Sequence, residues 1–333
     1  MRNSTMQHFI HQANHYGAKS APFFFLIDFE QQKPLIFPLE ETAQRGIFFD
    51  ILGKTNITES KNFSTDIHFE KYPIPLSDYQ QGFDVVQKDI QKGNSYLLNL
   101  TSPTEISGNF SLEQIFYQSS APYKLWLKNQ FVCFSPECFI NIQDNKILTY
   151  PMKGTINAAL PNAKQQLLND EKELREHYTI VDLMRNDLAM VATNIQVTKF
   201  RYVDRIATQK GEILQTSSEI CGELDEHWQQ NIGNILATLL PAGSISGAPK
   251  EKTVQIIQQA ERQPRGYYTG IFGLFDGENL QSAVAIRFIS QTGEKYYFHS
   301  GGGITIQSRL EDEYQELLEK VYLPSFRRTE ETK

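Results

Sequence analysis

The chain has 333 residues, of which 40% are hydrophobic and 21% charged, so it is long enough to bury a substantial core. Its formal net charge is −7, which argues against a basic surface for nucleic acid. The three cysteines have neither metal-binding nor disulfide spacing, and no stretch approaches the roughly 20 apolar residues of a membrane span. Because the N-terminal residues also lack the apolar core of a signal peptide, we expect a cytoplasmic protein that binds neither nucleic acid nor membrane.

The N-terminal residues predict one helix followed by buried strands. Residues 6–16 have a helical pattern that ends at Gly17. Apolar runs at residues 22–28 and 46–51, each bounded by breakers, are typical of buried strands. The polar residues 55–72 predict a loop with little fixed structure.

The next stretch, up to residue 150, predicts mostly sheet. Residues 77–91 form an expected amphipathic helix that stops at Gly93, and residues 112–117 form a shorter helix. Short runs of apolar and aromatic residues predict strands at residues 96–101, 123–127, 131–134, 139–142 and 147–150.

The C-terminal half mixes helices and strands. The longest helical pattern covers residues 163–192, a second covers residues 232–240, and a third follows the glycine- and serine-rich turn at residues 241–250. Further strands are expected at residues 195–200, 203–207, 270–275, 281–289 and 295–299. A turn is expected at residues 301–303 and a closing helix at residues 310–322. Because strands and helices do not alternate regularly, we expect one α+β domain rather than a doubly wound parallel sheet.

Two glycine-rich turns invite comparison with phosphate-binding loops. Residues 242–250 lack the Gly-Lys-Ser/Thr ending of a P-loop, and Gly301–Gly303 lacks a third glycine at dinucleotide spacing. Nucleotide binding is therefore disfavoured. Such turns still present backbone N–H groups to anions, and carboxylates are anions too.

Two pairs of acids are each spaced for one face of a helix: Glu173 with Glu176, and Glu313 with Glu316. One interpretation is that both pairs are solvated helix faces. The other is that the two helices meet, in which case four carboxylates would repel unless a cation lay between them. Oxygen ligands alone favour Mg²⁺.

Three further residues could take part in chemistry, and two of them, Lys153 and Arg287, have two interpretations each. Lys153 follows a predicted strand and Pro151; it is either a solvated turn lysine or an amine placed at the mouth of a sheet to act as nucleophile or base. Glu137 lies in a tight turn between two strands, and a β-hairpin could bring it close to Lys153. Arg287 ends an apolar strand, where it either pairs with a structural carboxylate or binds an anionic ligand.

Taken in chain order, several stretches of residues 77–320 resemble the motifs of the chorismate-utilising enzymes. They are Lys92–Thr101, Ser135–Phe139, Pro151–Thr155, Glu176–Asp187, Pro241–Lys250, Arg265–Gly270, Ala283–Arg287 and Gly301–Lys320. The chain looks most like the aminodeoxychorismate synthase branch, whose Lys-Gly-Thr motif it carries. The resemblance implies two packed sheets with helices outside, in which residues 77–325 form the chorismate-binding catalytic core and residues 1–76 a shortened, strand-rich part of the same domain.

The resemblance also implies roles for individual residues. Glu137 matches the general acid that protonates the departing C4 hydroxyl of chorismate, and Lys153 matches a lysine proposed to attack C2 of the ring. The acids of a Mg²⁺ site are matched by Glu173, Glu176, Glu313 and Glu316, of which Glu176 and Glu316 are the expected direct ligands. The positions that hold the two substrate carboxylates are matched by Gly154, Thr155, Tyr268, Arg287, Gly301 and Lys320.

The implied activity is the amination of chorismate to 4-amino-4-deoxychorismate, for 4-aminobenzoate and folate biosynthesis. Mg²⁺ would be the cofactor, and a partner glutamine amidotransferase would supply ammonia. A separate aminodeoxychorismate lyase would act downstream, because no pyruvate-lyase domain is appended. The alternatives are an anthranilate synthase component I, which typically has alanine in place of Lys153, and a non-catalytic scaffold subunit of the family.

Three further expectations concern the pKa of Lys153 and two positions where the chain differs from the family pattern. A lysine that attacks carbon must be neutral, so the pKa of Lys153 should be lowered. Leu97 stands where ammonia-using members usually carry glutamine and water-using members lysine, which argues against isochorismate or salicylate synthase activity. Little sequence precedes the core where anthranilate synthases carry their tryptophan site, so we expect no feedback inhibition by tryptophan.

Overall fold

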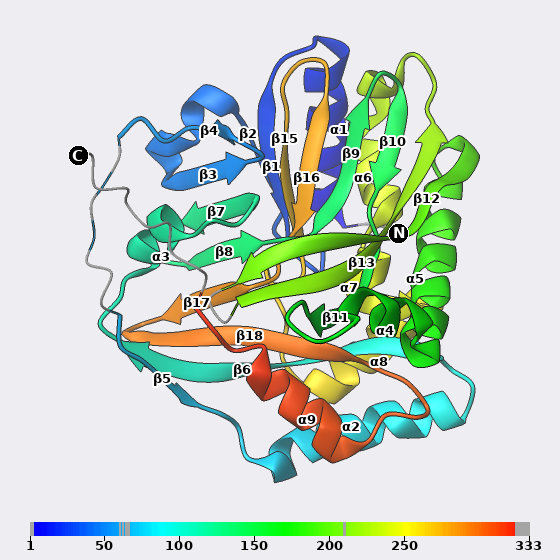
Figure 1. The fold of residues 1–333 in the computed structure, drawn as a ribbon. Coiled ribbons are helices and arrows are strands. Elements are labelled where there is room, and N and C mark those ends of the chain that lie inside the picture. Colours follow the sequence, from blue (N-terminus) through cyan, green and yellow to red (C-terminus); the bar gives the residue numbers. More distant parts are fainter. Residues whose placement is uncertain (1–2, 60, 62, 64–66, 209–210, 324–333) are drawn as a thin grey trace.

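A computed structural model describes residues 3–59, 61, 63, 67–208 and 211–323 of the chain (Figure 1). Within these residues the strands form two nine-stranded sheets, in which neighbouring strands pair antiparallel. The predicted α+β fold, with two sheets and helices outside, is confirmed.

The first sheet has the order β11–β13–β10–β9–β16–β15–β1–β2, and β12 pairs with β13. Its strands are β1 Phe23–Ile27, β2 Leu35–Pro38, β9 Cys138–Gln143, β10 Lys146–Thr149, β11 Met152–Asn157, β12 Thr193–Thr208, β13 Gly211–Glu223, β15 Ile271–Phe275 and β16 Leu280–Val284.

The second sheet has the order β14–β6–β18–β17–β8–β7–β3–β4, and β5 pairs with β6. Its strands are β3 Ile47–Ile51, β4 Lys54–Thr55, β5 Phe69–Tyr72, β6 Leu97–Gly108, β7 Tyr123–Leu127, β8 Phe131–Ser135, β14 Gly247–Ala248, β17 Phe288–Thr292 and β18 Lys295–Ile304.

The helices lie around the two sheets, with α2 and α9 below β6 and β18 in Figure 1 and α5 along one side. They are α1 Ser4–Ala18, α2 Leu76–Gln91, α3 Leu112–Gln118, α4 Ala163–Asn169, α5 Glu171–Ala189, α6 Ile232–Leu239, α7 Gly243–Ser246, α8 Lys250–Glu261 and α9 Leu310–Glu319. In the part of the chain that the structure describes, no helix combines the length and apolarity needed to cross a membrane.

The strand β1, next to the edge strand β2, shows how the core is built. All five of its residues are buried, because successive side chains point to opposite faces and both faces are covered. Phe23 and Phe25 pack in one apolar cluster with Met6 and Phe9 of α1. Phe24 faces the other sheet, where its ring stacks on Phe49 of β3 at 5.4 Å between centroids.

The N-terminal strands belong to both sheets. β1 pairs with β15, and β3 pairs with β7. Residues 1–76 thus contribute strands that pair directly with strands from later in the chain, while the boundary at residue 76 stays a prediction.

Several predicted elements differ in the structure. The single helix over residues 163–192 is two helices, because Asp170 caps the second one: its Oδ1 accepts a hydrogen bond from the Glu173 N–H at 3.0 Å. The strands at 195–200 and 203–207 are one strand, β12, with shifts in register. Strands β2, β4, β11, β13 and β14 were not predicted. Strand β5 forms at the end of the predicted loop 55–72, of which residues 60, 62 and 64–66 lie outside the described residues.

Two further differences bear on the function. The predicted turn Gly301–Gly303 is part of β18, where Gly302 pairs with Leu100 of β6. The predicted strand 281–289 is interrupted at Arg287, whose φ of +52° breaks the extended backbone between β16 and β17.

Candidate active site

The two predicted catalytic residues flank one β-hairpin. β9 and β10 pair antiparallel, with Gln143 opposite Lys146, so the residues before β9 and after β10 lie at the same end. Glu137 immediately precedes β9, and Lys153 is the second residue of β11, which follows β10 closely. The predicted hairpin is therefore confirmed, although Lys153 contacts an acid of α5 rather than Glu137.

Glu137 is held in a largely buried position by bonds from both neighbouring segments. Its N–H donates to Ser135 Oγ at 3.1 Å, and Ser244 Oγ donates to its Oε1 at 2.5 Å. Burial raises the pKa of Glu137, and the Ser244 hydrogen bond and the Arg287 charge only partly offset that effect. The carboxyl group therefore keeps its proton to a higher pH than a solvated glutamate does, as a general acid requires.

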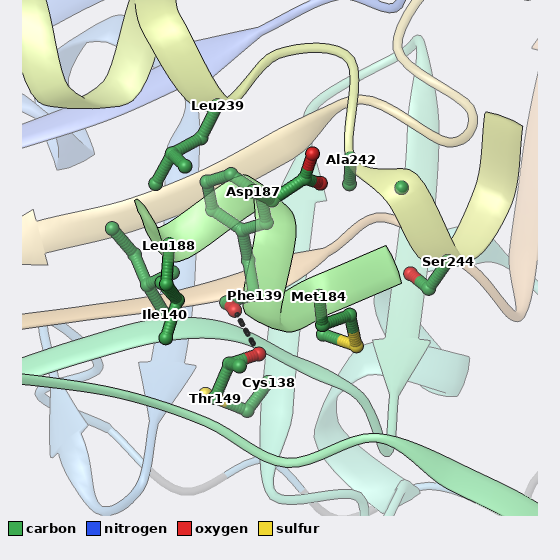
Figure 2. A pocket seen from close by; sticks show the side chains of 11 residues that line it. Cys138, Phe139, Ile140, Thr149, Met184, Asp187, Leu188, Leu239, Ala242 and Ser244 are labelled. Atoms are coloured by element: carbon green, nitrogen blue, oxygen red, sulfur yellow. Dashed lines mark hydrogen bonds between the residues drawn. The ribbon is translucent and has the colours of Figure 1, made fainter. Parts of the chain in front are cut away.

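A half-buried ion pair fixes the turn that carries Ser244. Lys250 Nζ lies 3.0 Å from Asp187 Oδ1 and donates to Leu239 O at 2.8 Å. Asp187 also accepts a hydrogen bond from the backbone N–H of Gly243 at the start of α7. Figure 2 shows Asp187 and Met184 of α5 and Ser244 of α7 around the small pocket that these segments line.

Lys153 lies against the acidic helix α5. Its Nζ is 2.6 Å from Glu176 Oε2, and its backbone carbonyl accepts a hydrogen bond from Thr216 Oγ1 of β13. The next residue, Gly154, has a φ of +88°, and a Cβ there would lie 2.9 Å from Glu173 Oε2. Glycine at position 154 thus allows the acidic pair of α5 to approach the strand that carries Lys153.

The expected lowering of the Lys153 pKa is wrong for this arrangement. Burial disfavours the ammonium form, but the contact with Glu176 and the nearby charges of Glu173 and Glu316 outweigh it, so the pKa of Lys153 is raised. The expectation came from the need for a neutral amine, which desolvation or nearby cationic charge could supply and the acid cluster would oppose. The three carboxylates reverse the sign.

The two acidic pairs face the same lysines. Glu173 and Glu176 of α5 and Glu316 of α9 all lie within electrostatic range of Lys153. Glu313 accepts a hydrogen bond from Ser308 Oγ at 2.6 Å, and burial raises its pKa. Both pairs are therefore placed toward one region and are not simply solvated faces.

The predicted metal ligands are Glu173, Glu176, Glu313 and Glu316. Among the described residues, no three histidine, cysteine or acidic side chains gather as a metal site. Glu176 contacts Lys153, and Glu316 contacts Lys320. Their chemistry nevertheless fits Mg²⁺, since every donor is a carboxylate oxygen. Glu173 Oε2 is in addition buried without a hydrogen-bond partner, as an oxygen reserved for a cation would be. The assignment stays a prediction.

Gly301 lies on a stretch of β18 that pairs with β6 on one side. Lys320 Nζ donates to Gly301 O at 2.7 Å and contacts Glu316 Oε1 at 2.6 Å. Because the N–H and C=O of one strand residue point to the same edge, the Gly301 N–H also faces the edge where Lys320 lies. A backbone donor and an ammonium group therefore meet at this edge, which suits an anion.

Arg287 connects the two ends of the site. Its charge lowers the pKa of both the Glu137 carboxyl and the Lys320 ammonium. Its Nε donates to Tyr322 Oη at 2.6 Å. Arg287 is thus not paired with a structural carboxylate in the described contacts, which favours the second interpretation, binding of an anionic ligand.

The remaining predicted binding residues are Tyr268 and Thr155. Tyr268 is buried, with its ring 5.0 Å from His299, and it lies within electrostatic range of Arg287 and Glu137. Thr155 is exposed on β11, opposite Gln215 of β13. Their contact with substrate stays a prediction.

Sequence reasoning missed two residues that touch the site, Ser244 and Tyr322. Ser244 was visible only as part of a glycine-rich turn with backbone donors, and its bond to Glu137 spans 107 residues. Tyr322 had no signal, because the sequence placed it at the end of the closing helix as an ordinary surface aromatic; in the structure it follows α9 and is 42% exposed.

Comparison with known proteins gives a consistent result. Residues 7–324 match the family described as chorismate binding enzyme. An "uncharacterized PabA-like protein" of Haemophilus influenzae is 75% identical over 97% of this chain and 98% of its own length.

More distant relatives are named for their enzymatic activities. The aminodeoxychorismate synthase component 1 of Escherichia coli is 31% identical over 82% of this chain and 63% of its own length. An anthranilate synthase component 1 of Haloarcula marismortui is 32% identical over 71% of this chain and 48% of its own length. The chain thus spans about half to two thirds of these longer relatives.

A solved structure shares the fold. A putative 2,3-dihydroxybenzoate-specific isochorismate synthase of Bacillus anthracis superposes with a TM-score of 0.70 over 96% of this chain and 88% of that protein, at 18% identity. The likeness extends to both sheets, because it covers nearly the whole chain.

Proposed function

The chain belongs to the chorismate-binding enzyme family, and we propose that it is the chorismate-aminating component of an aminodeoxychorismate synthase. In this proposal it converts chorismate and ammonia to 4-amino-4-deoxychorismate and water. A partner glutamine amidotransferase supplies the ammonia, and a separate lyase uses the product for 4-aminobenzoate and folate. The relative in Escherichia coli that carries this activity supports the proposal.

The observation that carries the proposal is the position of Lys153 between the acidic side chains and the cationic side chains of the site. Its amine lies 2.6 Å from Glu176 and within electrostatic range of Glu316 and Lys320. Arg287, near Lys320, also reaches Glu137. A nucleophile, an acid and the cations for an anionic substrate therefore surround one region.

Glu137 acts as the general acid in the proposed mechanism. Hydroxide is a poor leaving group, so the C4–O bond breaks only as a proton reaches the oxygen. Burial raises the pKa of Glu137 and so favours its protonated form, and Ser244 donates a hydrogen bond to Oε1. The acidic proton is thereby directed to Oε2, which delivers it, and water leaves.

Lys153 acts as the nucleophile. Its free amine forms the N–C2 bond as the ring double bonds shift and the C4–O bond breaks. Because Glu176 is an expected Mg²⁺ ligand, the proton that the amine must lose passes to Glu173, which lies within electrostatic range of Lys153 and has an oxygen without a hydrogen-bond partner among the described residues. Ammonia then bonds to C4 and passes one proton to the Glu137 carboxylate, which restores the acid. The double bonds shift back, and the C2–N bond breaks as the proton taken from Lys153 returns to its nitrogen.

The substrate carboxylates would be held by Arg287, the Gly301 N–H and Lys320, with Tyr268 beside them. Mg²⁺, held by Glu176 and Glu316 with Glu173 and Glu313 around them, would neutralise a ring carboxylate and fix the dianion in place. Holding both carboxylates places C2 against Lys153 and the C4 hydroxyl against Glu137.

The experiment that tests the proposal is a product analysis. The purified protein is incubated with chorismate, Mg²⁺ and ammonium, and the products are separated by chromatography and mass spectrometry. We expect 4-amino-4-deoxychorismate. Anthranilate with pyruvate as the product would instead assign the anthranilate synthase activity, and no loss of chorismate would favour a scaffold role.

A further inference from the structure

We propose that Tyr322 is a substrate-binding residue: it fixes the Arg287 guanidinium, and the two side chains together bind one carboxylate of the substrate. The inference rests on the proposed function, because it takes the substrate to be the chorismate dianion. Tyr322 lies beyond the last helix, outside the motifs that carry the resemblance to the family.

Hydrogen bonds from neighbouring residues hold the backbone at Arg287 in an unusual conformation. Its φ of +52° is unfavourable for a residue with a Cβ. The conformation is held by neighbours: Phe134 N–H donates to Arg287 O at 3.1 Å, and the Cys133 thiol donates to Ile286 O at 3.1 Å. Such a strained and anchored position suits a residue that must aim its side chain at a ligand.

Tyr322 then fixes the guanidinium group. Arg287 Nε donates to Tyr322 Oη at 2.6 Å, and the guanidinium carbon lies 5.3 Å from the centre of the Tyr322 ring. This contact uses the Nε–H donor and leaves the four N–H donors of Nη1 and Nη2. These two nitrogens form the planar fork that binds a carboxylate with two parallel hydrogen bonds.

The phenol also has a donor of its own. Tyr322 Oη accepts from Arg287 through a lone pair, so its O–H proton remains able to donate. On the edge of the guanidinium that carries Nε, one Nη–H lies parallel to the Nε–H that Tyr322 accepts. An anion that accepts from this Nη–H lies next to the hydroxyl, so the pair offers it the phenol proton in addition to the guanidinium donors.

The position of Tyr322 in the chain places this pair at the substrate edge of β18. Lys320, two residues earlier, donates to Gly301 O at 2.7 Å, and the Tyr322 ring lies 6.4 Å from that of Phe298 on β18. The segment 320–322 thus brings Lys320 and Tyr322 to the same edge, one beside Gly301 and the other beside Arg287.

The test compares chorismate binding by calorimetry in the wild type and in Tyr322→Phe, which removes the hydroxyl and keeps the ring. We expect the Kd, and the KM where turnover is measured, to rise about tenfold, with kcat changed less than about threefold. The matched control is Tyr72→Phe, since Tyr72 is an exposed tyrosine whose hydroxyl bonds to Glu70 on the surface. An unchanged Kd in Tyr322→Phe would overturn the inference.

A double-mutant cycle separates this role from a merely structural one. Arg287→Lys removes both the Nε–H and the fork, so Tyr322→Phe in that background should change the Kd by less than about twofold. Equal effects of Tyr322→Phe in both backgrounds would show that the hydroxyl does not act through Arg287. A wild type that binds chorismate without aminating it would refute the proposed function, while the Kd comparison would still decide the role of Tyr322. A wild type that does not bind chorismate would refute both.

Discussion

Replacing Ser244 with alanine tests how the acidity of Glu137 is set. Ser244 Oγ donates to Glu137 Oε1 at 2.5 Å, and this bond stabilises the ionised carboxylate relative to the neutral acid. Its removal leaves burial, the largest cause of the raised pKa, opposed by the Arg287 charge alone. We therefore expect the pKa of Glu137 to rise further in Ser244→Ala.

The size of the effect follows from the kind of bond. A hydrogen bond to a charged group contributes about 1.5–3 kcal/mol, and one pKa unit corresponds to about 1.4 kcal/mol. The pKa of Glu137 should therefore rise by about 1–2 units. Because Glu137 must be protonated to act, kcat/KM falls as the pH passes above its pKa, so this falling limb should move to higher pH.

The assay measures kcat/KM for chorismate consumption as a function of pH. Total ammonium is adjusted at each pH so that the concentration of neutral ammonia stays saturating. Ser244→Thr retains a hydroxyl and is the matched variant; its falling limb should stay near that of the wild type. A falling limb at the same pH in Ser244→Ala and the wild type would refute the reasoning, because Ser244 would then not set the acidity of Glu137.

Three further predictions follow from single residues and the metal. Lys153→Ala should cut amination by at least about a hundredfold in a chorismate assay, and an unchanged rate and product would exclude a nucleophilic role. An excess of chelator should abolish turnover and added Mg²⁺ should restore it; full activity in chelator would remove the metal assignment. His299 is desolvated, which lowers its pKa to about 4, so the unfolded state takes up its proton first as the pH falls. Wild-type stability to urea should therefore drop by up to about 3 kcal/mol between pH 6.5 and 4, and this drop should be smaller in His299→Gln.

The sequence predicted well the features that are decided locally. The strand β7 at Tyr123–Leu127 matches the prediction residue for residue, because its apolar run is bounded by turns on both sides. The hairpin between Glu137 and Lys153 followed from two short runs and the turn between them. In contrast, Gly301–Gly303 was read as a turn, because three glycines have no strand propensity; pairing with β6 overrides it.

What could not be predicted depends on residues that are distant in sequence. The bond from Ser244 to Glu137 spans 107 residues, and that from Arg287 to Tyr322 spans 35. Lys153 is the clearest case, since its position came from a short motif but its charge state depends on which helices face it. Glu176 arrives on α5 and Glu316 on α9, and their charges outweigh the burial that the motif alone suggests. The motif therefore identifies the amine that can react, whereas the packing of α5 and α9 determines whether that amine is protonated before the reaction.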